Sequence, residues 1–574
     1  MDKIQRLCKW LQSSGASFDK IELKPDGDGG FGAYTNCKTE KDECLASIPY
    51  NLAITENVAL ETLKDHLIQP LRGARIMCLF LVYERWVRGD SSFWSPYIDC
   101  LPKTFSTPFY YNDDELKFLK GTPTETAIAA RLDKYKEDWK AVRSSIPTSM
   151  ISDEQLSWEN YLWSANVYSS RAFPSSLVPG LDAEGSHNEA LFPLLDMLNH
   201  RPTQPITWDS TDSSIKFIFR DSFEAGEQVF NNYGPKSNQE LLMSYGFCIP
   251  GNIQDLYHVK LNCSNAPEGL RKEKFIKDIG LFKLDHYIRA ANLSENTILP
   301  MMRVMVMNDI ELFYSEEEYS GHGQPDTNFI SFRNELSVFS TLGQLLKSKE
   351  TTILDIDSTI LGGNNSQSKL HKSNIFTTGI KRILSSSLSK IDKTKISLLQ
   401  AVKEMMSMNE VTSLLPRWLS KSGSEIKTPS LAEISEDVVD NLALNELISS
   451  VIISDESFEE DRTFSSAINT RDIDLDSALA LFLLRCRYRK SSKWYGVIGQ
   501  YKRLELTHIM PEDRIGKLKI KYDSLFPELS DSYPKLFSSS KFTLDNFMWA
   551  AQMTNLFNVH INIGEYSVYG LCLA

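Results

Sequence analysis

Three short segments of the sequence gather side chains that can bind a charged ligand or take part in acid–base and transfer chemistry. Residues 163–174 read WSANVYSSRAFP, where an apolar helical pattern ends in the segment Ser170-Arg171-Ala172-Phe173. Residues 194–200 read LLDMLNH, with polar side chains set against an apolar run. Residues 231–247 read NNYGPKSNQELLMSYGF, with two Tyr-Gly pairs twelve positions apart. These segments are the candidate site that the rest of the chain must position.

Each of these residues also has a structural explanation when it is taken alone. Arg171 can pair with a carboxylate of the protein itself, and Asp196 can cap a turn. Asn199 and His200 can be core polar groups with satisfied hydrogen bonds, and tyrosines are more often core aromatics than catalytic groups. The hypothesis of a site therefore depends on the three segments occurring together.

A glycine-rich run near the start imitates a nucleotide-binding motif. Residues 27–32 read GDGGFG, which fits the pattern G-x-G-x-x-G. A dinucleotide site needs a strand before this pattern and a helix after it, whereas residues 33–37 alternate like a second strand. We therefore predict a glycine hairpin that joins strands at about 20–24 and 33–37. Its backbone can lie close to a ligand because glycine has no Cβ.

Metal-site and secretion signals are missing from the sequence. The nine cysteines are scattered, and no C-x-x-C pair or H-E-x-x-H motif occurs, so we expect neither a metal site nor a disulfide framework. The first residues precede no apolar segment of the kind that secretory signals contain. The longest apolar stretch, near residues 76–83, is far shorter than the roughly 20 residues that span a bilayer. We expect no membrane partner and a reducing compartment, the cytoplasm or also the nucleus.

The net charge of the chain indicates which kind of macromolecule it binds. Lys and Arg number 62 against 75 Asp and Glu, which gives a formal net charge of −13. This disfavours direct binding of a nucleic acid, because phosphate binding requires a basic face. It is compatible with an acidic groove that attracts a basic protein.

The 574 residues are enough for two hydrophobic cores. In the first half, residues 60–86 and 157–169 are apolar at helical spacing, and residues 113–142 indicate a charged, exposed helix. Short strand-like runs cover residues 215–220 and 228–233. After about residue 260 the pattern changes to longer helices.

One segment of the second half departs from this helical character. Residues 351–395 are rich in Ser, Thr, Asn and Gly and poor in aromatic residues. Such a composition buries too little apolar surface to offset the entropy of ordering the chain. We therefore predict a mobile insertion there.

Taken together and in this order, the SRAF, DMLNH and NNYGPKSNQELLMSYGF motifs resemble those of SET-domain protein lysine methyltransferases of the Rubisco large-subunit methyltransferase-like class. Within that class the sequence is most similar to fungal enzymes that methylate ribosomal proteins, elongation factors or cytochrome c. The resemblance implies an α+β fold. A SET-domain β-fold would occupy residues 1–260, with a helical insertion at about 60–165. A mainly α-helical substrate-binding domain would occupy residues 261–574 and contain the mobile insertion at about 351–395.

The resemblance also implies a cofactor, S-adenosyl-L-methionine, and a set of site residues; no metal is required. Tyr233 matches the catalytic tyrosine. The implied cofactor-binding residues are Gly29, Gly30, Arg171, Asn199, His200 and Tyr233, and the implied substrate-binding residues are Phe173, Asp196 and Tyr245. In the family the hairpin usually reads like G-x-G-x-x-A, from which Asp28 and Gly32 depart in this sequence.

The roles that the resemblance implies follow the chemistry of methyl transfer. Arg171 would grip the carboxylate of the cofactor, and the Asn199–His200 pair would hold its amino-acid end and adenine. The hydroxyl of Tyr233 would orient the amine, while Phe173 and Tyr245 would wall the lysine channel. A lysine ammonium of pKa about 10.4 must first lose its proton, and desolvation beside a sulfonium lowers that pKa.

Several substrates remain open at this point. The first expectation is a basic, non-histone protein of the translation machinery, a ribosomal protein or an elongation factor, methylated by a monomeric enzyme. The alternatives are the same chemistry on cytochrome c, on another non-histone protein or on a histidine side chain. A third hypothesis is a catalytically dead SET-like binding module. The retained site residues argue against it, and the altered glycine hairpin argues for it.

Overall fold

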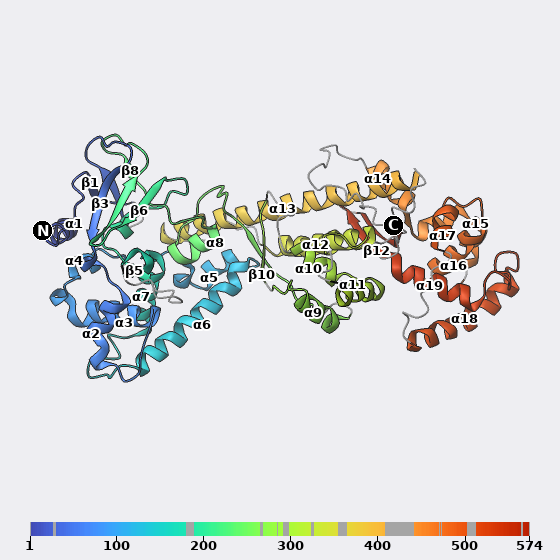
Figure 1. Cartoon of the computed structure of the whole chain (residues 1–574), viewed down its shortest axis with the longest axis horizontal. Coiled ribbons are helices and arrows are strands. Elements are labelled where there is room, and N and C mark those ends of the chain that lie inside the picture. Colours follow the sequence, from blue (N-terminus) through green and yellow to red (C-terminus); the bar gives the residue numbers. More distant parts are fainter. Residues whose placement is uncertain are drawn as a thin grey trace. The chain divides into compact units, whose positions relative to one another are not determined.

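The chain divides into two compact units, described here from a computed structural model (Figure 1). Unit 1 contains Met1–Asp255 and Thr352–Ile380, and unit 2 contains Leu256–Thr351 and Lys381–Ala574. Unit 1 thus includes a second segment of the chain, which the predicted division near residue 260 did not anticipate. The structure describes residues 2–26, 30–179, 189–263, 268–283, 285–290, 298–322, 327–353, 364–407, 441–469, 471, 473–501, 512–563 and 566–572.

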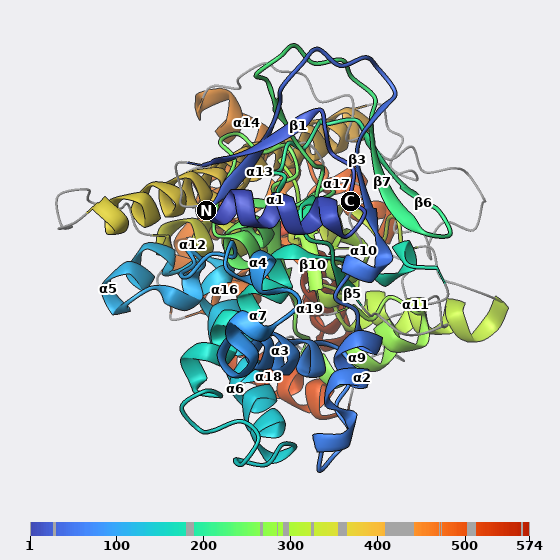
Figure 2. The ribbon, with the colours of Figure 1, turned by 90° about the vertical axis from the view of Figure 1, so that its left-hand side faces the viewer.

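Unit 1 contains small antiparallel sheets. One has the order β1-β2-β8, a second the order β3-β7-β6, and a third pairs β4 with β5. Burial alternates along β7, as expected for a strand with one face on the core. Figure 2 shows β3, β7 and β6 beside one another. The strands are β1 (Ile21–Pro25), β2 (Phe31–Thr35), β3 (Glu43–Pro49), β4 (Ala172–Pro174), β5 (Glu189–Leu191), β6 (Ile206–Ser210), β7 (Ser214–Phe219) and β8 (Gln228–Val229).

Helices fill the chain between β3 and β4. Seven of the nine residues of α3 are buried, because its sequence is apolar on nearly every face, and α3 packs against α7. The predicted exposed helix at residues 113–142 is interrupted at Gly121, whose φ of +77° favours glycine. These helices, together with the N-terminal helix and a short one after β8, are α1 (Lys3–Ser13), α2 (Glu56–Leu63), α3 (Ala74–Val82), α4 (Ser95–Ile98), α5 (Asp113–Leu116), α6 (Pro123–Ser144), α7 (Trp158–Arg171) and α8 (Asn238–Glu240).

The prediction of a mobile insertion is wrong for residues 364–395. They lie in α13 (Asn364–Ser407), which buries an apolar face that includes Phe376, Ile380, Ile383 and Leu384. These residues recur at helical spacing, so the few apolar side chains are concentrated on one face while the Ser and Thr residues dilute the average composition. Residues 354–363 of the predicted insertion lie outside the described residues.

Unit 2 is mainly helical, as predicted. Its core contains two buried ion pairs, Arg303–Glu335 and Arg333–Glu311, whose side chains are all less than 10% exposed. None of the helices in the described parts of the chain is long and apolar enough to cross a membrane. The helices of unit 2 are α9 (Gly269–Asp278), α10 (Ile298–Met305), α11 (Asp309–His322), α12 (Phe332–Thr352), α14 (Asn441–Val451), α15 (Arg462–Asn469), α16 (Leu475–Tyr488), α17 (Tyr495–Gln500), α18 (Glu512–Ser532) and α19 (Leu544–Phe557). Its strands are β9 (Tyr257–Lys260), β10 (Asp285–Ile288), β11 (Ile452–Ile453), β12 (Asn558–Ile563) and β13 (Tyr566–Cys572).

Candidate active site

Arg171, Asp196 and Tyr97 form a buried hydrogen-bonded cluster in unit 1. Nη1 of Arg171 donates to Oδ2 of Asp196 at 3.1 Å and to its backbone oxygen at 3.0 Å. The hydroxyl of Tyr97 donates to the same Oδ2 at 2.7 Å. The side chain of Asp196 has no exposed surface, and that of Arg171 is 15% exposed. A buried carboxylate requires such partners, so two donors fix its orientation.

Local structure explains how these residues meet. Arg171 is the last residue of α7, whose N-terminus is capped by the Ser157 side chain. The chain then enters β4, which pairs with β5, and returns to Asp196 in the 3₁₀ turn Leu195–Met197. Leu194 enters this turn with a φ of +80°, a conformation that costs a non-glycine residue about 1–3 kcal/mol. Backbone strain of this kind is concentrated at functional sites.

A second cluster is a stack of three rings. The ring centroids of His200 and Tyr233 lie 4.8 Å apart, as do those of Tyr233 and Tyr245, with interplanar angles of 14° and 24°. Nδ1 of His200 accepts the backbone N–H of Tyr233 at 3.0 Å. The hydroxyl of Tyr233 donates to the backbone oxygen of Leu198 at 2.8 Å. The stack is therefore fixed by hydrogen bonds at two points.

The two clusters adjoin. Burial raises the pKa of Tyr233, and the positive charge of Arg171 lowers it in part while Asp196 raises it. The phenol is consequently neutral near pH 7 and keeps its proton as a hydrogen-bond donor. Burial lowers the pKa of His200, so its imidazole is neutral as well.

The backbone joins the second and third sequence segments. The backbone N–H of Asn231 donates to the backbone oxygen of Asn199 at 2.8 Å, and that of Arg201 donates to Asn231 at 2.9 Å. Asn231 is buried, and its Oδ1 accepts the indole N–H of Trp208 at 3.1 Å. Segments that are separate in the sequence are thus held in register.

The SNQE part of the third segment anchors the ring stack. Ser237 and Glu240 form a capping box at the start of α8. The backbone N–H and Nδ2 of the buried Asn238 donate to the two carboxylate oxygens of Asp255 at 2.6 and 2.8 Å. A π-helical turn, Leu241–Tyr245, follows directly and carries the last ring of the stack.

Gly246 ends this turn at a point of close approach. Its φ is +75°, and a Cβ at this position would lie 2.8 Å from the backbone carbon of Ser106 and 2.9 Å from the backbone nitrogen of Thr107. Only glycine avoids both the unfavourable φ and the clash. The second Tyr-Gly pair therefore has a steric basis, whereas a Cβ on Gly234 of the first pair would meet no atom within 4 Å.

The predicted glycine hairpin is confirmed, since β1 pairs antiparallel with β2 and no helix follows the glycines. Gly29 lies outside the described residues. A Cβ on Gly30 would meet nothing within 4 Å, whereas one on Gly32 would lie 2.7 Å from Nε2 of Gln228. The close approach therefore occurs at Gly32, a position where the sequence departs from the family pattern.

Asn199 connects the hairpin to the second segment. Its Nδ2 donates to Oδ2 of Asp26 at 2.6 Å, immediately before the glycines. The side chain of Asn199 therefore has a structural partner. The cofactor-binding role implied for Asn199 and for Gly30 stays a prediction.

Phe173 lies apart from the ring stack. It is 5% exposed and its ring contacts those of Phe192, Trp208 and Phe217 at centroid distances of 5.6, 5.3 and 6.1 Å. These aromatic residues belong to the hydrophobic core of unit 1. The position of Phe173 therefore favours core packing over the predicted channel wall, which Tyr245 is better placed to form.

Among the residues that the structure describes, three buried polar atoms of the site have no hydrogen-bond partner. They are Nε of Arg171, Oδ1 of Asp196 and Nε2 of His200. Leaving such groups unpaired costs about 1–3 kcal/mol each, and native proteins rarely do so without a reason. A donor and a carboxylate oxygen in adjacent side chains complement the carboxylate and ammonium of an α-amino acid. The amino-acid end of S-adenosylmethionine has this chemistry, so the residues fit that cofactor.

No family model matches the chain. The chain is 38% identical over 244 residues to "Ribosomal lysine N-methyltransferase set10" of Schizosaccharomyces pombe. The aligned region covers 41% of this chain and 43% of that protein. It is 24% identical to "Protein-lysine N-methyltransferase EFM1" of Saccharomyces cerevisiae over 96% of this chain and 94% of that protein. It is 28% identical to "Actin-histidine N-methyltransferase" of Gallus gallus over 62% and 63%. The match to set10 thus spans less than half of that protein.

Solved structures decide the fold. A structure of "Rubisco LSMT bound to AdoMet" matches with a TM-score of 0.57 and 20% identity, covering 70% of this chain and 94% of that chain. The "SET domain of LSMT bound to MeLysine and AdoHcy" matches with the same values. The chain has the SET-domain fold. The predicted α+β fold class and the predicted resemblance to this class of proteins are both confirmed.

Tyr97 of this SET-domain protein could not be predicted from its sequence. Tyr97 comes from α4, 99 positions before Asp196, and no motif surrounds it. The only local signal is an aromatic residue in an apolar stretch, which is ordinary core composition. In the part of the chain that the structure describes, no group of His, Cys, Asp and Glu is arranged to hold a metal ion.

Proposed function

We propose that this SET-domain protein is an S-adenosylmethionine-dependent methyltransferase that modifies a lysine side chain of a protein. The observation that carries the proposal is the pair of buried atoms without partners, Nε of Arg171 and Oδ1 of Asp196. In the proposed complex the guanidinium binds the carboxylate of the cofactor and the carboxylate of Asp196 accepts its ammonium. The names of set10 and EFM1, both lysine methyltransferases, support the same class of activity.

The ring stack would serve the other reactant. When bound, the cofactor supplies a methyl group on a sulfonium, so that one C–S bond breaks as an N–C bond forms. Tyr233 and Tyr245 would line the approach of the lysine, and their apolar faces would desolvate the amine and favour its neutral form. The hydroxyl of Tyr233 already lies in a fixed position against Leu198, so the site contributes alignment rather than a strong base.

The substrate that we propose is a protein of the translation machinery, a ribosomal protein or an elongation factor. The support is the relative with 38% identity, set10, which is named as a ribosomal lysine methyltransferase. The alternatives are cytochrome c, another non-histone protein, a histidine target, and a binding module without activity. A histidine target has support of its own, since the chain is 28% identical to an actin-histidine methyltransferase.

We further propose that unit 2 docks the protein substrate while unit 1 holds the cofactor. The proposed setting is a monomeric enzyme in the cytoplasm or nucleus. The retained Arg171 and His200 argue against the inactive binding module, because a module without a reaction has no use for buried polar atoms that lack partners.

The test uses labelled S-adenosylmethionine, the purified protein and a lysate from cells that lack the gene. Labelled products are identified by gel and mass spectrometry, which also distinguishes methyllysine from methylhistidine. One labelled lysine on a ribosomal protein or elongation factor is the expected result. Binding of the cofactor without transfer to any protein would contradict the proposed activity and favour the binding module. No binding in calorimetry would contradict the proposed cofactor.

A further inference from the structure

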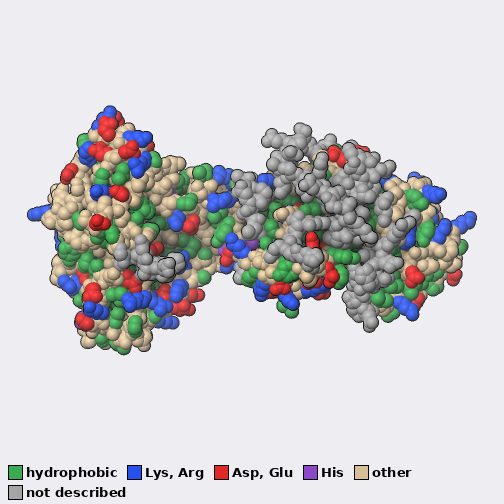
Figure 3. All heavy atoms as spheres, in the orientation of Figure 1, with side chains coloured by type: hydrophobic (Ala, Val, Ile, Leu, Met, Phe, Trp, Pro, Cys, Tyr) green, Lys and Arg blue, Asp and Glu red, His purple; other side chains and the backbone are tan. Residues whose placement is uncertain are grey.

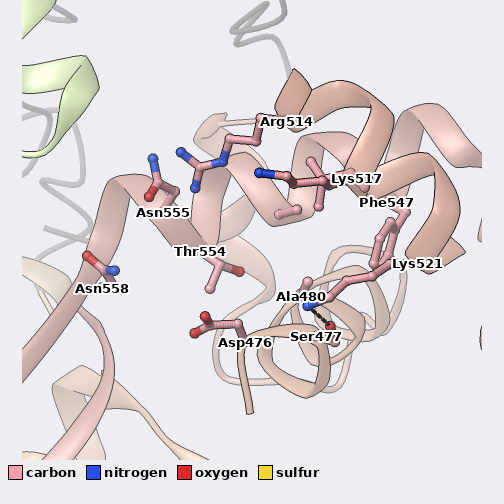
Figure 4. Close-up of a pocket in the computed structure, with 12 residues that line it drawn as sticks. Asp476, Ser477, Ala480, Arg514, Lys517, Lys521, Phe547, Thr554, Asn555 and Asn558 are labelled. Atoms are coloured by element: carbon pink, nitrogen blue, oxygen red, sulfur yellow. Dashed lines mark hydrogen bonds between the residues drawn. The ribbon is translucent and has the colours of Figure 1, made fainter. Parts of the chain in front are cut away.

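Unit 2 contains a cavity of about 260 Å³ that the proposed function does not use (Figure 4). It lies between α16, α18 and α19 and the start of β12. One wall carries Arg514, Lys517 and Lys521 of α18, and the opposite wall carries Thr554, Asn555 and Asn558. Figure 4 shows the charged ends of Arg514 and Lys517 directed toward the wall of Thr554 and Asn555.

The basic wall has a simple origin in the sequence. Arg514, Lys517 and Lys521 are spaced three and four residues apart, so they share one face of α18. Lys519, between them in the sequence, is exposed and does not line the cavity. The helix therefore presents a row of cations to the cavity rather than a uniformly charged surface.

The charge at the cavity opposes that of the whole chain. Its lining includes three cations and one carboxylate, that of Asp476, while the chain has a formal net charge of −13. Nζ of Lys521 already donates to Oδ2 of Asp474 at 2.9 Å, so Arg514 and Lys517 are the cations that the inference uses. Oδ1 of Asp476 accepts the hydroxyl of Tyr569 at 2.8 Å, so that carboxylate has a partner outside the row. Nη1 of Arg514 lies 3.4 Å from Asp309, and both side chains are more than a third exposed. Such an exposed pair is worth less than about 1 kcal/mol and exchanges easily for another anion.

The size and the opposite wall indicate the kind of ligand. Sites for drug-sized ligands or cofactors usually measure about 300–1,000 Å³, so this cavity is suited to a side chain. The amides of Asn555 and Asn558 can each donate to and accept from a peptide backbone. Phe547 and Leu518 add apolar surface for the methylene groups of a long side chain.

We propose that this cavity receives a carboxylate side chain from an acidic segment of the protein substrate. That the partner is the protein substrate rests on the proposed function. That the bound side chain is a carboxylate rests on the row of cations on α18. It differs from the expectation of a wholly basic partner, because the docked segment is acidic even where the methylated lysine lies in a basic region. Arg514 and Lys517 bind the carboxylate, and the amides of the opposite wall bind the backbone beside it.

The binding test uses a labelled peptide of Glu, Gly and Ser residues and the full-length protein, followed by fluorescence anisotropy. The double variant Arg514→Gln/Lys517→Gln should weaken binding about tenfold, since it removes two exposed ion pairs. Lys519→Gln is the matched control and should bind as the wild type does. Binding should weaken with added salt, and a peptide with Gln in place of Glu should bind as weakly as the double variant does.

Three outcomes would overturn the inference. They are equal binding of the Gln peptide, an equal effect of Lys519→Gln, or binding of inorganic phosphate at the row without binding of the peptide. Calorimetry with S-adenosylmethionine separates this inference from the proposed function. The double variant should bind the cofactor normally and show a raised KM for the protein substrate with little change in kcat. If the wild type does not bind the cofactor, the proposed function is contradicted. The inference about the cavity is not, because the peptide test does not need the cofactor.

Discussion

At the scale of single residues, our proposal depends on the orientation of the Asp196 carboxylate, which would accept the ammonium of the cofactor. Burial raises the pKa of this carboxyl, and Arg171 and Tyr97 oppose that effect. One oxygen is occupied by these two donors and the other has no partner. Tyr97 is therefore a positioning residue in our proposal, acting on the ligand through Asp196.

The first prediction concerns Tyr97→Phe. Without the hydroxyl, one donor to Asp196 is lost and the pKa of the carboxyl rises further, so protonation begins at a higher pH. Because the ionised form accepts the ammonium, cofactor affinity should fall by at least about tenfold at neutral pH. As the pH is lowered, affinity should also be lost earlier than in the wild type. Calorimetric titration of S-adenosylmethionine across a pH series measures both effects.

Tyr111→Phe is the control for this prediction, since Tyr111 is also a buried tyrosine of unit 1. It should leave the pH profile of binding unchanged. If the role of Tyr97 is purely structural, Tyr97→Phe will lower the thermal stability and leave the pH profile of binding as in the wild type. That result would contradict the positioning role.

The second prediction concerns Tyr233→Phe. The variant keeps the ring stack with His200 and Tyr245 and loses only the hydroxyl that orients the amine. Cofactor affinity should remain nearly intact while kcat falls roughly a hundredfold, as when one positioned polar group is removed from an active site. Single-turnover methylation and calorimetry on the same preparation check the two values. Equal losses in both would mean that Tyr233 is mainly structural.

At the scale of elements, the turn from α8 to Gly246 depends on backbone geometry. The third prediction is that Gly246→Ala destabilises the protein by more than about 2 kcal/mol, because it combines a positive φ with a clash at 2.8 Å. Gly234→Ala is the matched control, since its φ is +92° and its surroundings are open. It should cost about 1 kcal/mol. Urea unfolding followed by tryptophan fluorescence compares them, and equal midpoints would contradict the steric argument.

The elements also show what a sequence can predict. The strands around residues 20–37, α7 and the turn after Ser237 were predictable, because their alternation, apolar periodicity and capping residues are local. Arg171, His200 and Tyr233 were found because each lies in a short motif. Tyr97 was not, since its contact with Asp196 depends on packing across 99 positions. The helix α13 was missed because average composition hides an amphipathic face.

At the scale of the whole molecule, the net charge does not describe the local distribution of charged side chains. On the face drawn in Figure 3, acidic and basic side chains are interspersed. The described residues on that face form no continuous acidic surface for a basic partner, despite the net charge of −13. In our proposal, recognition therefore depends on a local feature, the cation row of α18, more than on the total charge.

The fourth prediction concerns a buried ion pair across 254 positions of the chain. Nζ of Lys369, on α13, donates to Oε2 of Glu115 at 2.7 Å and to the backbone oxygen of Tyr110 at 3.0 Å. Lys369→Met should destabilise unit 1 by about 3–5 kcal/mol, because it removes the ammonium that donates to the buried Glu115 carboxylate. Adding Glu115→Gln should recover part of that loss. Thermal unfolding of the wild type and the two variants provides the measurement, and an unaltered melting temperature for Lys369→Met would contradict the prediction.

The second segment of unit 1 has a consequence for synthesis on the ribosome. Thr352–Ile380 belongs to the same unit as Met1–Asp255, and Gly379 passes so close to Asp255 that a Cβ would lie 2.8 Å from its Oδ2. Asp255 in turn anchors Asn238 beside the ring stack. A nascent chain therefore cannot complete unit 1 when its first 255 residues emerge, and must wait until residues 352–380 have left the exit tunnel. During that interval the apolar surface that α13 covers is open to chaperones.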